Sequence, residues 1–215
     1  MSSSVIRTTR PLSILSDFVV EELPIVLNEI DSDKAQISLI RTTEKLTKII
    51  ENQAISDNVL TLLDLKFMEA AYYDNDLEIP ESLISLTDTY ANHFCVLPML
   101  TYELIILVNP SQDLRLFSSQ ETGEHEKLFY ESHKSVEAKL SPLINFLLEI
   151  SRENKFGQKS LRQLRTLLPN MKAAVEQMLG LMSRMSAPEY SIFRRYFTKH
   201  PTRGFPGASG AYSAI

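Results

Sequence analysis

The sequence predicts an all-α protein, a multi-helix bundle, and three observations support that prediction. The 215 residues contain only 6 Gly, and three of them (Gly204, Gly207 and Gly210) fall in the segment 204–215. Over the rest of the chain, apolar residues recur at spacings of three and four, the period of an amphipathic helix. No Asn-Gly or Asp-Gly pair, the strongest short signal for a β-hairpin, occurs anywhere.

Composition excludes several classes of protein. Hydrophobic residues make up 44% of the chain, enough for a sizeable core. A net charge of -5, from 22 Lys plus Arg against 27 Asp plus Glu, argues against binding nucleic acid or an anionic membrane surface. The single cysteine, Cys95, excludes a disulfide framework and fits a reducing, cytoplasmic setting. The first ten residues lack the apolar stretch of a secretory signal, and the most apolar window, 94–108, is too short to cross a membrane.

Before residue 80 we expect three helices, over residues 12–30, 34–52 and 58–72, with the first bent or split at Pro24. The polar stretch 73–82 then contains Pro80 and is typical of a linker. The sequence therefore predicts two domains. Residues 1–79 would form a small N-terminal helical domain, and residues 80–215 would form the larger helical domain that carries the functional site.

Four further helices are expected after the linker. One covers about 81–108 with a bend at Pro98, and Cys95 within it has the apolar neighbours of a core residue. The next covers about 126–152 and is expected to be interrupted at Pro142. The last, over about 187–198, follows a capping box formed by Ser186 and Glu189.

Between the helices expected over 126–152 and 187–198 lies another helix, which has an unbroken apolar seam. Eight residues alternate steps of three and four: Leu161, Leu164, Leu168, Met171, Val175, Met178, Met182 and Met185. This is formally a coiled-coil pattern. Pro169 and the methionine-rich second half suit a specific two-stranded zipper poorly, so the pattern favours a helix buried within the molecule. A dimer seam remains the alternative.

Two features near the C-terminal end could bind a ligand. Glycines spaced by three in 204–213 permit tight turns whose N–H groups can cradle an anion, although a flexible terminus would have the same composition. Arg194 and Arg195 lie among aromatic residues just before that loop, an arrangement suited to binding a carboxylate; a solvated basic face is the alternative. The four histidines (His93, His125, His133 and His200) form no metal-ligand motif, so no metal ligand is predicted.

Three stretches, 80–110, 114–132 and 171–197, followed by the glycine-rich 204–215, carry a resemblance to a known group of proteins. Their succession resembles the indoleamine 2,3-dioxygenase side of the histidine-ligated heme dioxygenase superfamily. That superfamily also contains tryptophan 2,3-dioxygenase and the monodechloroaminopyrrolnitrin synthase-like proteins, and the chain is most similar to this last branch. The resemblance implies a heme dioxygenase-like helical fold with a glycine-rich loop.

The resemblance also implies site residues. Arg194, in EYSIFRRYF, would bind the substrate carboxylate, and Tyr190 and Tyr102 would line the pocket on the substrate side of the heme. Phe117 and Ser118, in LFSS, would lie beside the substrate ring. The loop contacting the heme edge would comprise Gly207, Ala208, Ser209, Gly210 and Ala211, with Ser209 also contacting the substrate amine.

The implied activity is that of a heme-dependent dioxygenase-like oxidoreductase. It would add dioxygen across the indole C2–C3 bond of tryptophan or a related indole amino acid, or perform a related ring rearrangement. In this superfamily, however, the histidine that ligates the heme iron follows the glycine loop, and none of the four histidines here matches it. Glu189 also stands where a second aromatic residue is common.

We therefore expect either a fragment that lacks a C-terminal segment or a protein that has lost heme. The expected partners are the indole substrate and dioxygen, with a homo-oligomer as a further possibility. From another functional class, the alternative is a non-catalytic helical scaffold that dimerises through the Leu161–Met185 seam.

Overall fold

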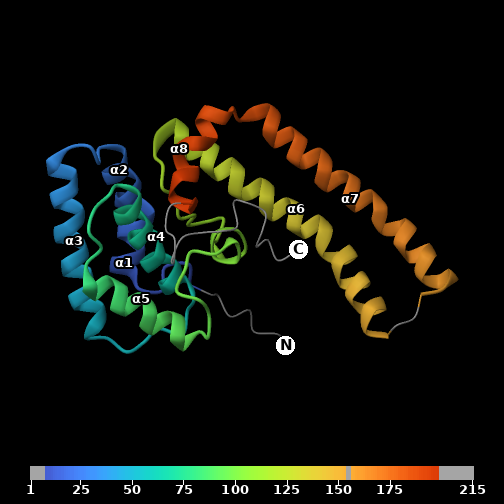
Figure 1. The fold of residues 1–215 in the computed structure, drawn as a ribbon, viewed down its shortest axis with the longest axis horizontal. Coiled ribbons are helices and arrows are strands. Elements are labelled where there is room, and N and C mark those ends of the chain that lie inside the picture. Colours follow the sequence, from blue (N-terminus) through green and yellow to red (C-terminus); the bar gives the residue numbers. More distant parts are fainter. Residues whose placement is uncertain (1–7, 154–155, 199–215) are drawn as a thin grey trace.

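A computed structural model describes residues 8–153 and 156–198 (Figure 1). Every regular element within these ranges is a helix, so the predicted all-α class is confirmed. None of the described helices has the length and apolarity needed to cross a lipid bilayer. The expected heme-contacting residues lie outside the described ranges: Gly207, Ala208, Ser209, Gly210 and Ala211.

The first expected helix is a continuous run of three short elements: α1 (Ser13–Asp17), the π-helix η1 (Phe18–Glu22) and α2 (Leu23–Asn28). Pro24 lies in the first turn of α2, directly after the π-turn. A wider π-turn leaves room where an ordinary helix would clash with a proline ring, so the run passes through Pro24. Leu15, Phe18 and Leu23 of this run are buried in the core.

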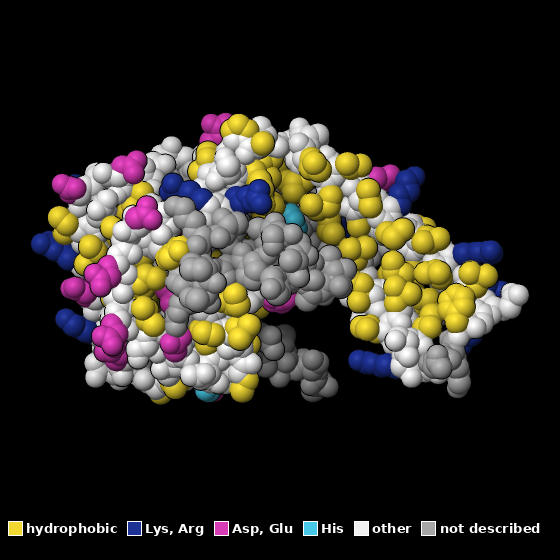
Figure 2. All heavy atoms as spheres, viewed as in Figure 1, with side chains coloured by type: hydrophobic (Ala, Val, Ile, Leu, Met, Phe, Trp, Pro, Cys, Tyr) yellow, Lys and Arg dark blue, Asp and Glu magenta, His cyan; other side chains and the backbone are white. Residues whose placement is uncertain are grey.

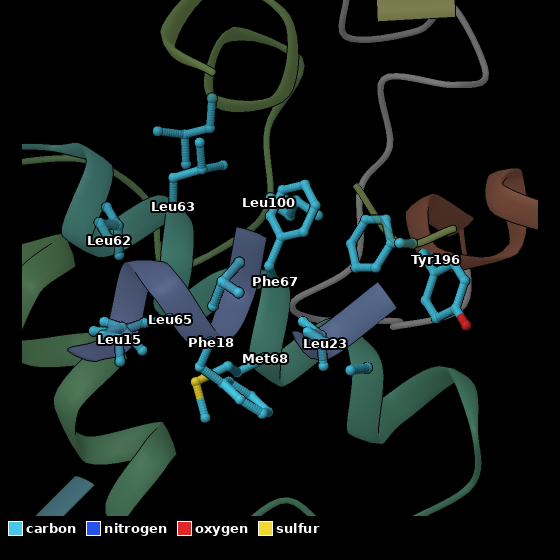
Figure 3. Close-up of a cluster of buried hydrophobic side chains, with 14 of the residues drawn as sticks. Leu15, Phe18, Leu23, Leu62, Leu63, Leu65, Phe67, Met68, Leu100 and Tyr196 are labelled. Atoms are coloured by element: carbon cyan, nitrogen blue, oxygen red, sulfur yellow. The ribbon is translucent and has the colours of Figure 1, made fainter. Parts of the chain in front are cut away.

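Helix α4 (Leu60–Asp74) is the centre of the molecule. It is buried on nearly all sides, and its buried residues include the charged side chains Asp64, Lys66, Glu69 and Asp74. Helix α5 (Glu81–His93) packs against it, and α3 (Asp33–Glu51) packs against α5 and α2. Figure 3 shows side chains of α4 meeting those of the first run, among them Leu62, Leu65, Phe67 and Met68, which have no exposed surface.

Residues 94–102 contradict the predicted helix over 81–108. Helix α5 ends at His93, Cys95 takes a positive φ of 54°, and helical structure resumes only in the π-helix η2 (Glu103–Val108). A left-handed residue just past the last turn is a common helix ending, and Pro98 disfavours a helical residue before it. Cys95 is exposed, so its expected place in the core was also wrong.

The second half of the chain forms a long helical hairpin. Helices α6 (Gln120–Glu153) and α7 (Gln158–Arg184) pack side by side and project from the rest of the molecule; we call this hairpin the arm (Figure 1). Pro142 lies inside α6, which continues through it, so the expected interruption does not occur. Helix α8 (Ala187–Thr198) then returns from the arm and packs against α4 and α6.

The predicted division into two domains and the predicted burial of the α7 seam can be compared with this fold. Residues on both sides of Pro80, such as Phe67 and Leu83, belong to one hydrophobic cluster, and the division into 1–79 and 80–215 stays a prediction.

The seam of α7 is buried only in part. Leu164, Met178 and Met185 are half-buried, whereas Val175 is 55% and Met182 is 72% exposed, and the buried residues of α7, Ala174 and Leu181, lie outside the seam. The seam is therefore not part of the core, contrary to the favoured interpretation.

Candidate functional site

Helix α8 carries two of the predicted substrate-binding residues, Tyr190 and Arg194. It begins at the predicted capping box: the backbone N–H of Ser186 donates to Glu189 at 2.5 Å, and that of Glu189 donates to the Ser186 hydroxyl at 3.4 Å. Tyr190 and Arg194 follow four residues apart, and this spacing puts both on one face of the helix. The guanidinium carbon of Arg194 lies 5.4 Å from the centre of the Tyr190 ring, a cation–π contact.

From Tyr190, ring contacts continue across α6 to Tyr102. The Tyr190 and Phe129 ring centres are 5.3 Å apart, those of Phe129 and His133 4.0 Å, and those of His133 and Tyr102 6.2 Å. We call these four residues the aromatic row. The row joins Tyr102, Tyr190 and Arg194, three of the predicted substrate-binding residues, although 92 positions separate Tyr102 from Arg194 in the chain.

Polar groups near the Tyr102 end define what this part of the row can do chemically. The Tyr102 hydroxyl donates to Glu137 Oε1 at 2.8 Å, and burial together with this acceptor raises the pKa of Tyr102. Burial lowers the pKa of His133, so its imidazole is neutral at neutral pH. Its Nδ1 lies 2.8 Å from the Phe129 carbonyl oxygen, which can only accept. Nδ1 therefore carries the proton, and Nε2 is left as a hydrogen-bond acceptor.

Of the two arginines of α8, Arg194 is the better suited to an anionic ligand. Its side chain is exposed, and none of the ion pairs between described residues involves it. The neighbouring Arg195 differs, because its Nε lies 2.7 Å from Oδ2 of the buried Asp74. A guanidinium with no carboxylate partner can bind a ligand carboxylate without first breaking an existing ion pair.

Phe117 and Ser118 lie elsewhere, on the core side of α8. The Phe117 ring is stacked between Phe67, at 4.2 Å, and Tyr196, at 4.3 Å, so both of its faces are covered. The buried Glu126 holds this segment by accepting the backbone N–H groups of Phe117 and Ser118. The structure therefore does not bring Phe117 and Ser118 into the aromatic row.

These two residues instead line a cavity of about 380 Å³ between α2, the segment 117–122 and α8. Its volume would suit a small ligand. Its charges suit a carboxylate poorly, because Asp31 lines it and the arginine at its edge, Arg195, is paired with Asp74. Of the two regions, the aromatic row with Arg194 is therefore the better candidate site for an amino acid.

Sequence reasoning missed Phe129, His133 and Glu137, three residues of α6 that link the predicted side chains. Their spacing of four was a usable signal, since it places all three on one helix face. The face was not singled out because nothing in the sequence shows that α6 lies between Tyr102 and α8.

The described residues contain no cluster of three or more His, Cys, Asp or Glu side chains that could hold a metal ion. The cavity beside Phe117 has no histidine in its lining. Of the four histidines, His200 lies outside the described ranges, and His93 and His125 lie beside Asp57 and Glu189. His133 has an unprotonated Nε2 but lies within the aromatic row, and the resemblance assigns none of the four histidines as the axial ligand.

Comparison of the chain with protein-family models, with curated proteins and with solved structures finds no match.

Proposed function

We propose that the protein binds a tryptophan-like indole amino acid at the aromatic row and is the substrate-binding part of a heme-dependent oxygenase-like protein. One observation carries the proposal: Arg194 lies over Tyr190 at one end of a continuous row of rings that ends at Tyr102. The resemblance to the heme dioxygenases assigns these same three residues to the substrate.

Each part of the row matches a part of such a ligand. Arg194 binds the carboxylate through two parallel N–H···O bonds, the strongest geometry open to this pair. The half-buried rings of Tyr190 and Phe129 offer apolar surface for an aromatic ring to stack against. His133 Nε2 is an acceptor for the indole N–H, because Nδ1 already holds the imidazole proton.

Heme enters the proposal only through the resemblance. The glycine-rich loop expected to contact it lies outside the described residues, and the resemblance assigns none of the four histidines as its axial ligand. When bound, heme would supply the activation of dioxygen, which side chains cannot perform. The contribution that we derive from this chain is therefore limited to binding and orienting the amino acid.

Binding can be measured directly because the protein contains no tryptophan. The fluorescence of added L-tryptophan, excited at the red edge of indole absorption, is then free of any indole signal from the protein. We expect its anisotropy to rise with protein concentration. Arg194→Ala should weaken binding by about 10- to 100-fold, the range for losing a charged hydrogen-bonded pair. The matched variant Arg184→Ala removes an exposed arginine of α7 and should leave binding unchanged.

Tryptamine, which lacks the carboxylate, separates the arginine contact from general ring stacking. It should bind the wild type more weakly than tryptophan, and its affinity should be the same for Arg194→Ala. Equal affinities of tryptophan and tryptamine for the wild type would refute the role of Arg194. The heme part has its own readout: titration with hemin should produce a Soret band, and its absence would refute heme binding by this chain without touching the amino acid result.

A further inference from the structure

The arm exposes an apolar face that its own two helices leave uncovered. Among the described elements, α7 has extensive contacts only with α6. Six large apolar side chains of α7 are nevertheless 37% to 72% exposed: Leu161, Leu168, Met171, Val175, Leu179 and Met182. At about 100° per residue they occupy one stripe, roughly a quarter to a third of a turn from the buried contact residues Ala174 and Leu181.

Helix α6 contributes a parallel stripe on the same side of the arm. Leu147 is 47% exposed, and Leu140 and Ile144 are half-buried. This row is also displaced by about a quarter turn from the contact residues of α6, Leu143 and Phe146, and in the same rotational sense as on α7. Because the helices are antiparallel, equal displacements bring both stripes to one side. Figure 2 shows apolar side chains spread over both helices of the arm.

The extent of this surface, which we call the arm face, matches what an interface needs. Its exposed side chains are each about half accessible and present on the order of 700 Å², close to the roughly 800 Å² that each partner contributes to a standard stable interface. Apolar patches of this size on monomers are uncommon and mark sites of association. An antiparallel helix pair with one apolar side is also half of a four-helix bundle.

We propose that the arm face binds the arm face of a second copy of this chain, so that two hairpins form a four-helix bundle. An apolar face is complementary to itself, as a two-fold interface requires. The charges of the helices favour one arrangement. Helix α6 carries seven Glu against four Lys plus Arg, whereas α7 carries five Lys plus Arg against one Glu. Each α7 therefore packs best against α6 of the partner copy rather than against its α7.

The oligomeric state of the full chain tests this interface. Sedimentation velocity over a series from low to high micromolar concentration should show a species of twice the 24.5 kDa chain mass. Val175→Glu and Met182→Glu each put a charge into the buried interface and should raise the dissociation constant about a hundredfold. Far-UV circular dichroism should show unchanged helix content, because both positions are exposed in the single chain.

Matched controls place the same charge on apolar positions outside the arm. Ile25, 58% exposed, and Leu97, 66% exposed, should tolerate glutamate without change in the dissociation constant. A wild type that remains monomeric throughout the series would overturn the proposal, since another occupant would then cover the arm face. A dimer that persists unchanged in Val175→Glu and Met182→Glu would overturn it equally.

Discussion

Glu126 should make the stability of the protein depend on pH in a way that one substitution removes. Its side chain is fully buried and accepts hydrogen bonds from the backbone N–H groups of Phe117 and Ser118 and, at 2.6 Å, from the Tyr130 hydroxyl. Burial nevertheless outweighs these donors and raises the pKa of Glu126 to about 7. We predict that Glu126→Gln flattens the pH dependence of the free energy of unfolding.

The size of the effect follows from the shift. A glutamate in the unfolded chain titrates near pH 4.5, so the folded state binds this proton more tightly than the unfolded state does. The stabilisation is complete below that pH and is lost as the pH rises through about 7. At about 1.4 kcal/mol per pKa unit, Glu126 should lower the free energy of unfolding by about 3 kcal/mol across this window. Glutamine is neutral throughout and contributes no such slope.

Urea denaturation followed by far-UV circular dichroism, repeated from about pH 4.5 to pH 8, measures this slope. Other titrating groups are common to both proteins, so the informative quantity is the difference between wild type and variant at each pH. Glu149→Gln is the matched control, because Glu149 is exposed on α6. A wild type and a Glu126→Gln variant with parallel profiles would refute the assignment of a raised pKa to this carboxyl.

Three further substitutions test the packing by the same denaturation measurement. A Cβ at Gly123 would lie 2.9 Å from the backbone oxygen of Ser118, so Gly123→Ala should destabilise by about 1–2 kcal/mol. A Cβ at Gly180 would have no neighbouring atom within 4 Å, so Gly180→Ala should stabilise helix α7 by up to about 1 kcal/mol. A change in the free energy of unfolding of the same sign for Gly123→Ala and Gly180→Ala would contradict the packing. The Asp64 carboxylate lies 2.6 Å from Arg115 Nε, and both side chains are buried. Arg115→Met leaves this carboxylate buried without its guanidinium and should lower the free energy of unfolding by about 3–5 kcal/mol. A decrease under about 1 kcal/mol would show that the pair is not buried as described.

The helices were predictable because their signals are local. Apolar spacing located the runs that became α3, α4 and α7, and the capping box at Ser186 located the start of α8. The errors arose where tertiary contacts decide. Packing against α7 carries α6 through Pro142, and the end of α5 rests on a positive φ at Cys95 that its residue type does not favour.

In the candidate site, too, local contacts could be predicted from the sequence and tertiary contacts could not. Tyr190 and Arg194 are four residues apart on one helix, so their contact could be inferred from the sequence. Their connection to Tyr102 depends on how α6 crosses between them, which no local pattern encodes. The separation of Phe117 from that group has the same cause: its ring is taken up by Phe67 and Tyr196, which come from helices α4 and α8.

The stack of Phe67, Phe117 and Tyr196 affects how Arg194 is presented to a ligand. The planes of neighbouring rings differ by only 5° and 4°, so helix α8 is anchored to the central helix by flat, fully covered surfaces. Arg194 lies on this anchored helix, two residues before the last ring of the stack. Under the proposed function, carboxylate binding would then have to order the exposed Arg194 side chain but not the helix that carries it.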